Sequence, residues 1–268
     1  MPRQIPIVRW KGPVFEQDVD LTADEAPLTI VVNSEAVTLT MRSPGNDKYL
    51  ALGLLYAEGL IRYAEDIAST ELIEHTRLMG EPDRICIELR DAAEIPRSGW
   101  ERRFPSTSSC GVCGKTDTQS LDCLIAPISS PLPEVTASVL YTLPGKMRDA
   151  QRDFGTTGGL HAAALFTDAG EILCVHEDIG RHNAVDKVIG EALERKCLPP
   201  VGAVLMTSGR SSFEIIQKAA VAGIPIVCAV SAPSSLAVRL AHDMNITLVG
   251  FLRGDTMNVY SCPSRIVV

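Results

Sequence analysis

Residues 203–251 read AVLMTSGRSSFEIIQKAAVAGIPIVCAVSAPSSLAVRLAHDMNITLVGF. Short apolar runs rich in β-branched residues alternate here with longer segments of helical periodicity, and short polar links join them. Strands separated by single helices pair in parallel through right-handed crossovers, so the stretch predicts an α/β sheet. The expected strands are 203–207, 225–230 and 246–251, and the expected helices are 212–222 and 234–243.

The residues just upstream extend this sheet. Two runs, 161–166 and 171–176, flank the turn-rich segment Thr167–Gly170, which predicts a hairpin. A helix is expected at 182–196. We therefore assign residues 145–268 to a C-terminal domain with a mixed, largely parallel sheet.

The first part of the chain predicts a separate small domain, residues 1–95, of α+β type with an antiparallel sheet. Runs at 28–32 and 36–41 indicate a hairpin. Asp47 is expected to cap a helix that ends near Gly59. Further strands are expected near 70–76 and 84–89.

Residues 96–144 are rich in Ser, Thr, Pro and Gly, which is typical of a flexible loop or linker. A helix near 138–154 is expected to lead out of it. Within this stretch lie Cys110 and Cys113, which form a CxxC pair.

Composition limits the classes of function. The 268 residues carry a net charge of −8, which argues against broad electrostatic binding to nucleic acid or to an anionic membrane. No apolar run is long enough to span a bilayer, and the first residues lack the build of a secretory signal. Cys86, Cys174, Cys228 and Cys197 lie in or beside apolar runs, as small buried residues do. We expect a cytoplasmic, mostly reduced protein.

The CxxC pair allows several interpretations. Structural zinc needs four ligands, and the chain has no second such pair, although two copies could share an ion. A thioredoxin-like role needs the pair at a strand-to-helix junction, whereas this one lies in a Ser/Gly-rich loop. The pair could also have no role. Sulfur transport suits the loop better, because it needs an exposed thiolate that can move between donor and acceptor. In that interpretation Cys110 carries the sulfur and Cys113 assists, although spacing alone does not rank them.

Three polar loops predict a binding pocket at the carboxyl edge of the second sheet. They are 176–183, 207–212 and 231–235. Each leads into a helix N-terminus, where free N–H groups suit phosphate, and Arg181 and Arg210 add charge. One such loop alone would be only a good helix cap. His182 alone suggests a capping or packing residue, and Asp186 with Lys187 suggests a solvated helix face.

Together these loops resemble the formate dehydrogenase accessory sulfurtransferase family, FdhD, over nearly the whole chain. The matching segments are Ser108–Gly114, Glu177–Lys187, Ser208–Glu214, Val230–Leu236, Leu54–Ile61, Gly159–Ala164 and Gly250–Arg253.

The resemblance implies a function. Such a protein takes persulfide sulfur from a cysteine desulfurase on Cys110. It passes the sulfur to the molybdenum or tungsten bis(pterin guanine dinucleotide) cofactor before that cofactor enters formate dehydrogenase. The resemblance also implies a cytidine deaminase-like three-layer second domain and a homodimer built largely through it. No resident metal is expected, because the chain lacks a second ligand pair for zinc. GDP is expected to bind as a fragment of the cofactor.

The expected cofactor-binding residues come from the loops and from the family segment at 251–256. They are Arg181, His182, Ser208, Gly209, Arg210, Ser231, Phe251, Leu252, Arg253, Gly254, Asp255 and Thr256. Two functions stay open, a persulfide sulfurtransferase and a non-catalytic chaperone that only presents the cofactor. Zinc-dependent deamination is excluded, because its ligands and glutamate are missing at the needed spacing.

Overall fold

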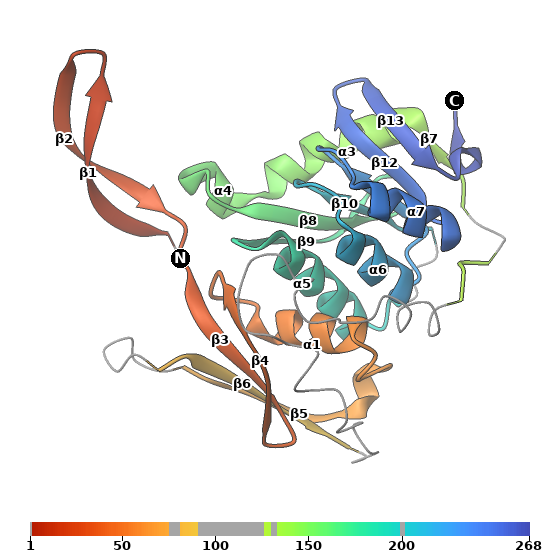
Figure 1. Cartoon of the computed structure of the whole chain (residues 1–268), viewed down its shortest axis with the longest axis horizontal. Helices are drawn as coiled ribbons and strands as arrows, with labels where there is room; N and C mark the ends of the chain where they lie inside the picture. Colours follow the sequence, from red (N-terminus) through yellow and green to blue (C-terminus); the bar gives the residue numbers. More distant parts are fainter. Residues whose placement is uncertain (1, 75–80, 91–125, 130–132, 199–201) are drawn as a thin grey trace.

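A computed structural model of the chain describes residues 2–74, 81–90, 126–129, 133–198 and 202–268 (Figure 1). The strands are β1 (Arg3–Lys11), β2 (Val14–Thr22), β3 (Ala26–Val32), β4 (Glu35–Arg42), β5 (Ile67–Ile73), β6 (Asp83–Leu89), β7 (Val135–Thr136), β8 (His161–Phe166), β9 (Ile172–Asp178), β10 (Val204–Thr207), β11 (Ile226–Ala229), β12 (Thr247–Arg253), β13 (Thr256–Ser261) and β14 (Ile266–Val267). The α-helices are α1 (Asp47–Ala57), α3 (Ala137–Ala150), α4 (Arg152–Thr157), α5 (Arg181–Glu194), α6 (Phe213–Val221) and α7 (Ser235–Asp243), with 3₁₀ turns η1 (Ala64–Asp66) and η3 (Pro263–Arg265).

The larger sheet has the strand order β13-β12-β11-β10-β8-β9. β10, β11 and β12 pair in parallel, while β8 is antiparallel to both β9 and β10, and β13 is antiparallel to β12. The predicted mixed α/β sheet is confirmed, with its hairpin at the β8–β9 connection. It is less parallel than expected, because only β10–β11 and β11–β12 pair in parallel and the other three pairings are antiparallel.

Helices cover both faces of this sheet, which gives three layers. Leu140 and Leu143 of α3 pack with Phe166 in one apolar cluster. On the other face Val185 of α5 and Ile216 of α6 pack in a second cluster, which also includes residues of α7. α3 begins at Ala137, so part of the stretch expected as a linker packs on this sheet.

The smaller sheet, β4-β3-β6-β5, is mixed rather than antiparallel, so that expectation was wrong. β6 inserts between β3 and β5 and runs parallel to β3, because the chain crosses over through α1 before β5 and β6 form their hairpin. Asp47 is also not the helix cap. Asn46 takes that position in a left-handed conformation (φ 58°), and the Asp47 carboxylate binds buried Arg42 instead.

The two sheets are joined through a close crossing of α1 and α5 (Figure 1). Gly53 of α1 lies so near α5 that a Cβ there would be 1.8 Å from the Asp186 carbonyl oxygen. A Cβ at Gly190 of α5 would be 1.9 Å from the Tyr49 carbonyl oxygen. Only glycine allows the two backbones to approach this closely.

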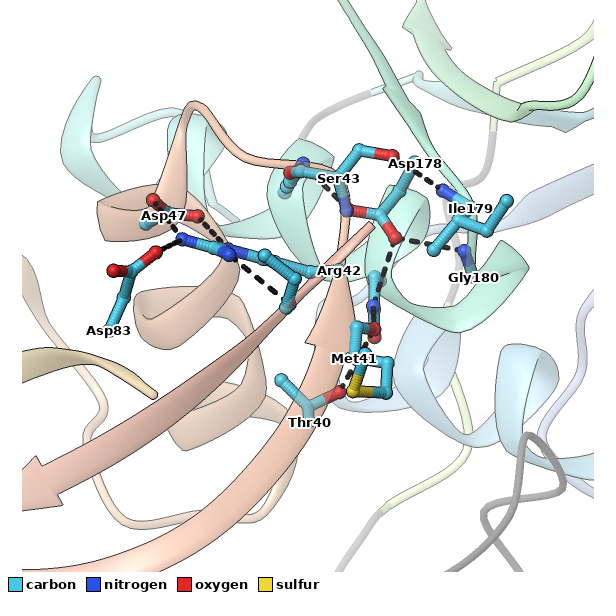
Figure 2. Close-up of polar contacts among 12 residues, drawn as sticks. Thr40, Met41, Arg42, Ser43, Asp47, Asp83, Asp178, Ile179 and Gly180 are labelled. Carbon is cyan, nitrogen blue, oxygen red and sulfur yellow. Dashed lines mark hydrogen bonds and ion pairs between the residues drawn. The ribbon is translucent and has the colours of Figure 1, made fainter. Parts of the chain in front are cut away.

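Buried charges reinforce the same junction (Figure 2). Asp178, at the end of β9, accepts from the backbone N–H of Ser43 at 3.2 Å and pairs with Lys187 at 2.7 Å. The Lys187 ammonium also donates to the Ser43 carbonyl at 3.0 Å. Asp186 pairs with Lys218, and burial raises the pKa of its carboxyl. The expectation that Asp186 and Lys187 form a solvated helix face was therefore wrong, since both are buried where α5 meets its neighbours.

The sequence interpretation did not include the N-terminal hairpin, β1 and β2, which projects away from both sheets (Figure 1). The strand register places Trp10 and Phe15 side by side on one face, with both rings exposed. The charged pairs Arg9–Asp18 and Lys11–Glu16 lie on the opposite face. Among the described helices, none is long and apolar enough to cross a membrane.

Candidate functional site

Four segments meet at one edge of the larger sheet. β9, β10, β11 and β12 run in the same direction, so their carboxyl ends share that edge. Backbone hydrogen bonds join the segments: Ser234 N donates to Ser211 O at 3.0 Å, and Phe251 N donates to Ser231 O at 3.2 Å. We call this set, residues 181–182, 208–212, 231–234 and 250–253, the loop edge. Segments that are far apart in the sequence therefore meet at the carboxyl edge of the sheet, as the strand–helix alternation predicted.

His182 is the best-anchored polar side chain of the loop edge. Its Nε2 lies 3.0 Å from the Ser212 hydroxyl and 3.0 Å from a Glu214 carboxylate oxygen. Ser212 is the N-cap residue of α6, yet its side chain makes no capping bond. The start of α6 therefore fixes the imidazole at the start of α5. Sequence reasoning named His182 as a site residue but gave Glu214 no role, because only the fold brings the two together.

Arg181 and Arg210 supply uncompensated positive charge. Neither forms an ion pair with another residue in the described part of the chain. The Nε atom of Arg181 is buried and has no hydrogen-bond partner there, whereas Arg210 is exposed. The hydroxyl of Ser211 is likewise buried and without a partner. A buried donor without a partner costs free energy, which suits a site completed by a ligand.

Ser208 and Gly209 hold the loop after β10 in place. The Ser208 hydroxyl accepts from Ala162 N at 2.9 Å, and Ser208 N donates to Ala162 O at 2.9 Å. A Cβ on Gly209 would lie 3.3 Å from Nδ1 of His161 and 3.6 Å from Cδ of Arg181. This loop therefore runs closely beside both side chains, and His161 joins the loop edge although sequence reasoning gave it no role.

The segment 251–256 divides into two parts. Phe251 has a left-handed backbone (φ 54°) at an irregularity in the β12–β13 pairing, and its side chain is 40% exposed. Such a conformation is costly for an aromatic residue, and strained backbones of this kind are common at active sites and ligand-binding sites. Arg253 donates through Nε to the Val230 carbonyl at 3.0 Å, whereas the Leu252 side chain lies in the core beneath α3. Gly254 and Asp255 form the turn into β13, which begins at Thr256.

The remainder of the loop 176–183 is structural. His176 is buried and contacts Glu191, and burial lowers the pKa of its imidazole. Glu177 accepts from three backbone N–H groups at the start of α4. Asn183 donates to Met41 O at 2.8 Å across the junction. A depression of about 480 Å³ near the start of α1 is lined by none of the loop-edge residues.

Cys110 and Cys113 lie outside the described residues. Among the cysteines that are described, Cys174 and Cys228 are buried, as expected, and burial raises the pKa of the Cys174 thiol to about 12. Such a thiol is a poor nucleophile at neutral pH. Cys86 and Cys197 were also expected to be buried. Cys86 is only partly buried, and Cys197 is exposed because it follows the end of α5. The described residues contain no cluster of three or more His, Cys, Asp or Glu suited to a metal.

Comparison with known proteins identifies the relatives of this chain. The sequence model of the FdhD/NarQ family matches residues 23–267. A protein from Mycobacterium tuberculosis named sulfur carrier protein FdhD is 49% identical over 252 residues, covering 91% of each chain. Proteins of the same name from Streptomyces coelicolor and Sulfolobus acidocaldarius are 43% and 39% identical; both cover 98% of this chain, and it covers 94% and 98% of theirs.

The fold has a solved counterpart. It resembles a crystal structure of a protein from Desulfotalea psychrophila described as a candidate formate dehydrogenase accessory protein. The TM-score is 0.79 at 25% sequence identity, and the match covers 99% of each chain. The likeness therefore extends over both sheets and the elements between them.

Proposed function

Because this chain belongs to the FdhD/NarQ family, we propose that it is a sulfur carrier that supports the maturation of a formate dehydrogenase. The relatives that carry this name match it along nearly their full length. The cysteine pair that the proposed carrier function needs is present at Cys110 and Cys113.

The proposed chemistry begins at Cys110. Its thiolate attacks the outer sulfur of a persulfide on a cysteine desulfurase, the donor's sulfur–sulfur bond breaks, and the donor leaves as a thiolate. Cys110 then holds the outer sulfur as its own persulfide. Attack by the Cys113 thiolate releases that sulfur as hydrosulfide and leaves a Cys110–Cys113 disulfide, so that the two electrons come from the thiol pair.

The acceptor we propose is the molybdenum or tungsten bis(pterin guanine dinucleotide) cofactor, bound as a substrate at the loop edge. One observation supports this most: Arg181 and Arg210 face no carboxylate partner among the described residues, and the buried Nε of Arg181 has no acceptor. The helices α5, α6 and α7 also begin at this edge, and helix N-termini favour phosphate. These groups suit the phosphates of such a cofactor.

Phe251 suits a different part of the same substrate. Its backbone N–H donates to the Ser231 carbonyl at the loop edge, and its aromatic side chain is exposed. An exposed ring of this kind can stack on a flat heterocycle such as guanine or a pterin. The loop edge thus combines cationic groups with an aromatic ring, a combination that suits a nucleotide.

The test is client activity in a strain that carries Cys110→Ala. We expect the variant to fold and to leave formate dehydrogenase inactive, with Cys113→Ala less severe because another thiol can release the sulfur. Full client activity with Cys110→Ala would refute the sulfur-carrier mechanism. It would favour a chaperone that binds and presents the cofactor without transferring sulfur.

A further inference from the structure

His161, the first residue of β8, has no role in the mechanism above, although its ring lies at the loop edge. Its Nδ1 is 3.3 Å from where a Cβ of Gly209 would stand, and Arg181 borders the same position at 3.6 Å. The side chain is half-buried. Its ring makes no hydrogen bond or ion pair with any residue in the described ranges, so both ring nitrogens are available to a ligand.

The charges around His161 are predominantly positive. Arg181 and His182 face it from the start of α5, and Arg210 faces it from the loop after β10. Asp178, at the end of β9, is the opposing charge, but its carboxylate already pairs with Lys187. Burial lowers the pKa of the His161 imidazole, and Arg181, His182 and Arg210 lower it further. Without a ligand the ring is therefore neutral near neutral pH.

We propose that His161 binds the anionic ligand of the loop edge directly and takes up a proton when that ligand binds. The inference rests on the proposed function, because it needs an anion at this edge. Phosphate oxygens next to His161 would reverse the sign of the local field and favour the imidazolium, which donates two hydrogen bonds. His161 is then a ligand-binding residue that adds positive charge only when phosphate is present.

This arrangement gives a pH dependence with a defined sign. In the free protein the pKa of His161 is lowered, so the proton is absent before binding. In the complex the pKa of His161 is raised. Anion binding therefore strengthens as the pH falls from the pKa of His161 in the complex to its pKa in the free protein. A neutral ligand such as guanosine would bring no charge and would cause no proton uptake.

The experiment is proton NMR of the full-length protein, which has five histidines. His161→Gln assigns the His161 ring signal. The pKa of His161 is then measured alone, with GDP and with pyrophosphate. We expect either anion to raise this pKa by about one unit or more. Calorimetry in buffers of different ionisation enthalpy should show that the wild-type protein takes up protons when the anion binds, and that the His161→Gln variant does not.

The matched control is His242→Gln, at an exposed histidine of α7. This variant should take up as many protons as the wild type.

The outcomes distinguish the role of His161 from the proposed substrate site at the loop edge. Binding of GDP with an unchanged pKa of His161 would overturn this inference and leave the proposed substrate site intact. An equal proton uptake in wild type and His161→Gln would overturn it as well. Absence of binding by both GDP and pyrophosphate would overturn the proposed substrate site, and the role of His161 with it.

Discussion

Arg210 is the exposed arginine of the loop edge, and its removal tests phosphate binding there. We expect Arg210→Ala to lose charge-assisted hydrogen bonds worth about 1.5–3 kcal/mol, which weakens GDP binding about ten- to a hundredfold. Calorimetry with GDP measures this. Arg239→Ala is the control, because it removes the same charge from an exposed position on α7 outside the loop edge. Equal losses in the two variants would indicate a general charge effect and would remove Arg210 from the site.

Lys187 allows a test of the buried junction. Lys187→Met would leave the Asp178 carboxylate without its ion-pair partner and the Ser43 carbonyl without its donor. We expect the free energy of unfolding to fall by about 3 kcal/mol or more. Lys11→Met, in an exposed pair with Glu16 on the β1–β2 hairpin, should change it by less than about 0.5 kcal/mol. Urea denaturation measures the free energy of unfolding of both variants. An unchanged free energy for Lys187→Met would show that the stability of the junction does not depend on the Lys187–Asp178 pair.

Some residues of the candidate site could be predicted from the sequence and others could not. Loop patterns identified Arg181, His182 and Arg210, because polar βα loops end at one edge of a parallel sheet. Glu214 and His161 lie in segments that match the family, but no role was assigned to them, since no spacing links them to His182 or Gly209. Asp186 and Lys187 look like an exposed helical pair in sequence. They are buried because α1 and α6 pack on α5, a contact that no local pattern specifies.

At the scale of elements, the crossing of α1 and α5 depends on two glycines. Gly53→Ala and Gly190→Ala would each place a methyl group on a backbone carbonyl, and the helices would have to separate. We expect each to lower the free energy of unfolding by about 3 kcal/mol or more. Gly145→Ala is the matched control within α3, where a Cβ would meet nothing within 4 Å. It should be neutral or stabilise by about 0.5–1 kcal/mol.

Thermal or urea unfolding of the three variants decides this point. Similar stabilities would mean that the helices can shift apart at little cost. A large loss for Gly53→Ala and Gly190→Ala alone would locate the stability of the junction in the close helix crossing.

Apart from β13, which was not predicted, the strands of the larger sheet could be predicted almost to their ends. Ser234 caps α7 through a bond to Ala237 N, as a serine before a helical pattern suggests. The smaller sheet was predicted less well. Its hairpins follow from local patterns, but the parallel pairing of β3 with β6 joins strands far apart in the chain. The β1–β2 hairpin was not predicted from the sequence, because its apolar residues are exposed and do not form a buried face.

At the scale of the whole molecule, the resemblance predicts a homodimer formed largely through the second domain. Sedimentation at micromolar concentration should then give a species of about twice the 28.9 kDa chain mass. A monomer under those conditions would contradict the expectation. The exposed face of β1 and β2 provides an internal check: Trp10→Ser should leave a dimer of the second domain unchanged, because Trp10 belongs to neither sheet of the main body.

The central claim is that Cys110 carries sulfur, and mass spectrometry of the peptide that contains Cys110 tests it most directly. The protein is incubated with a cysteine desulfurase and cysteine, and the peptide containing Cys110 is then analysed without reductant. We expect that peptide to gain about 32 Da, the mass of one sulfur atom, and dithiothreitol to remove the gain. Cys110→Ala should show no gain, and Cys197→Ala, at an exposed cysteine outside the pair, should behave as wild type. An unchanged mass at Cys110 while the desulfurase is active would contradict the account.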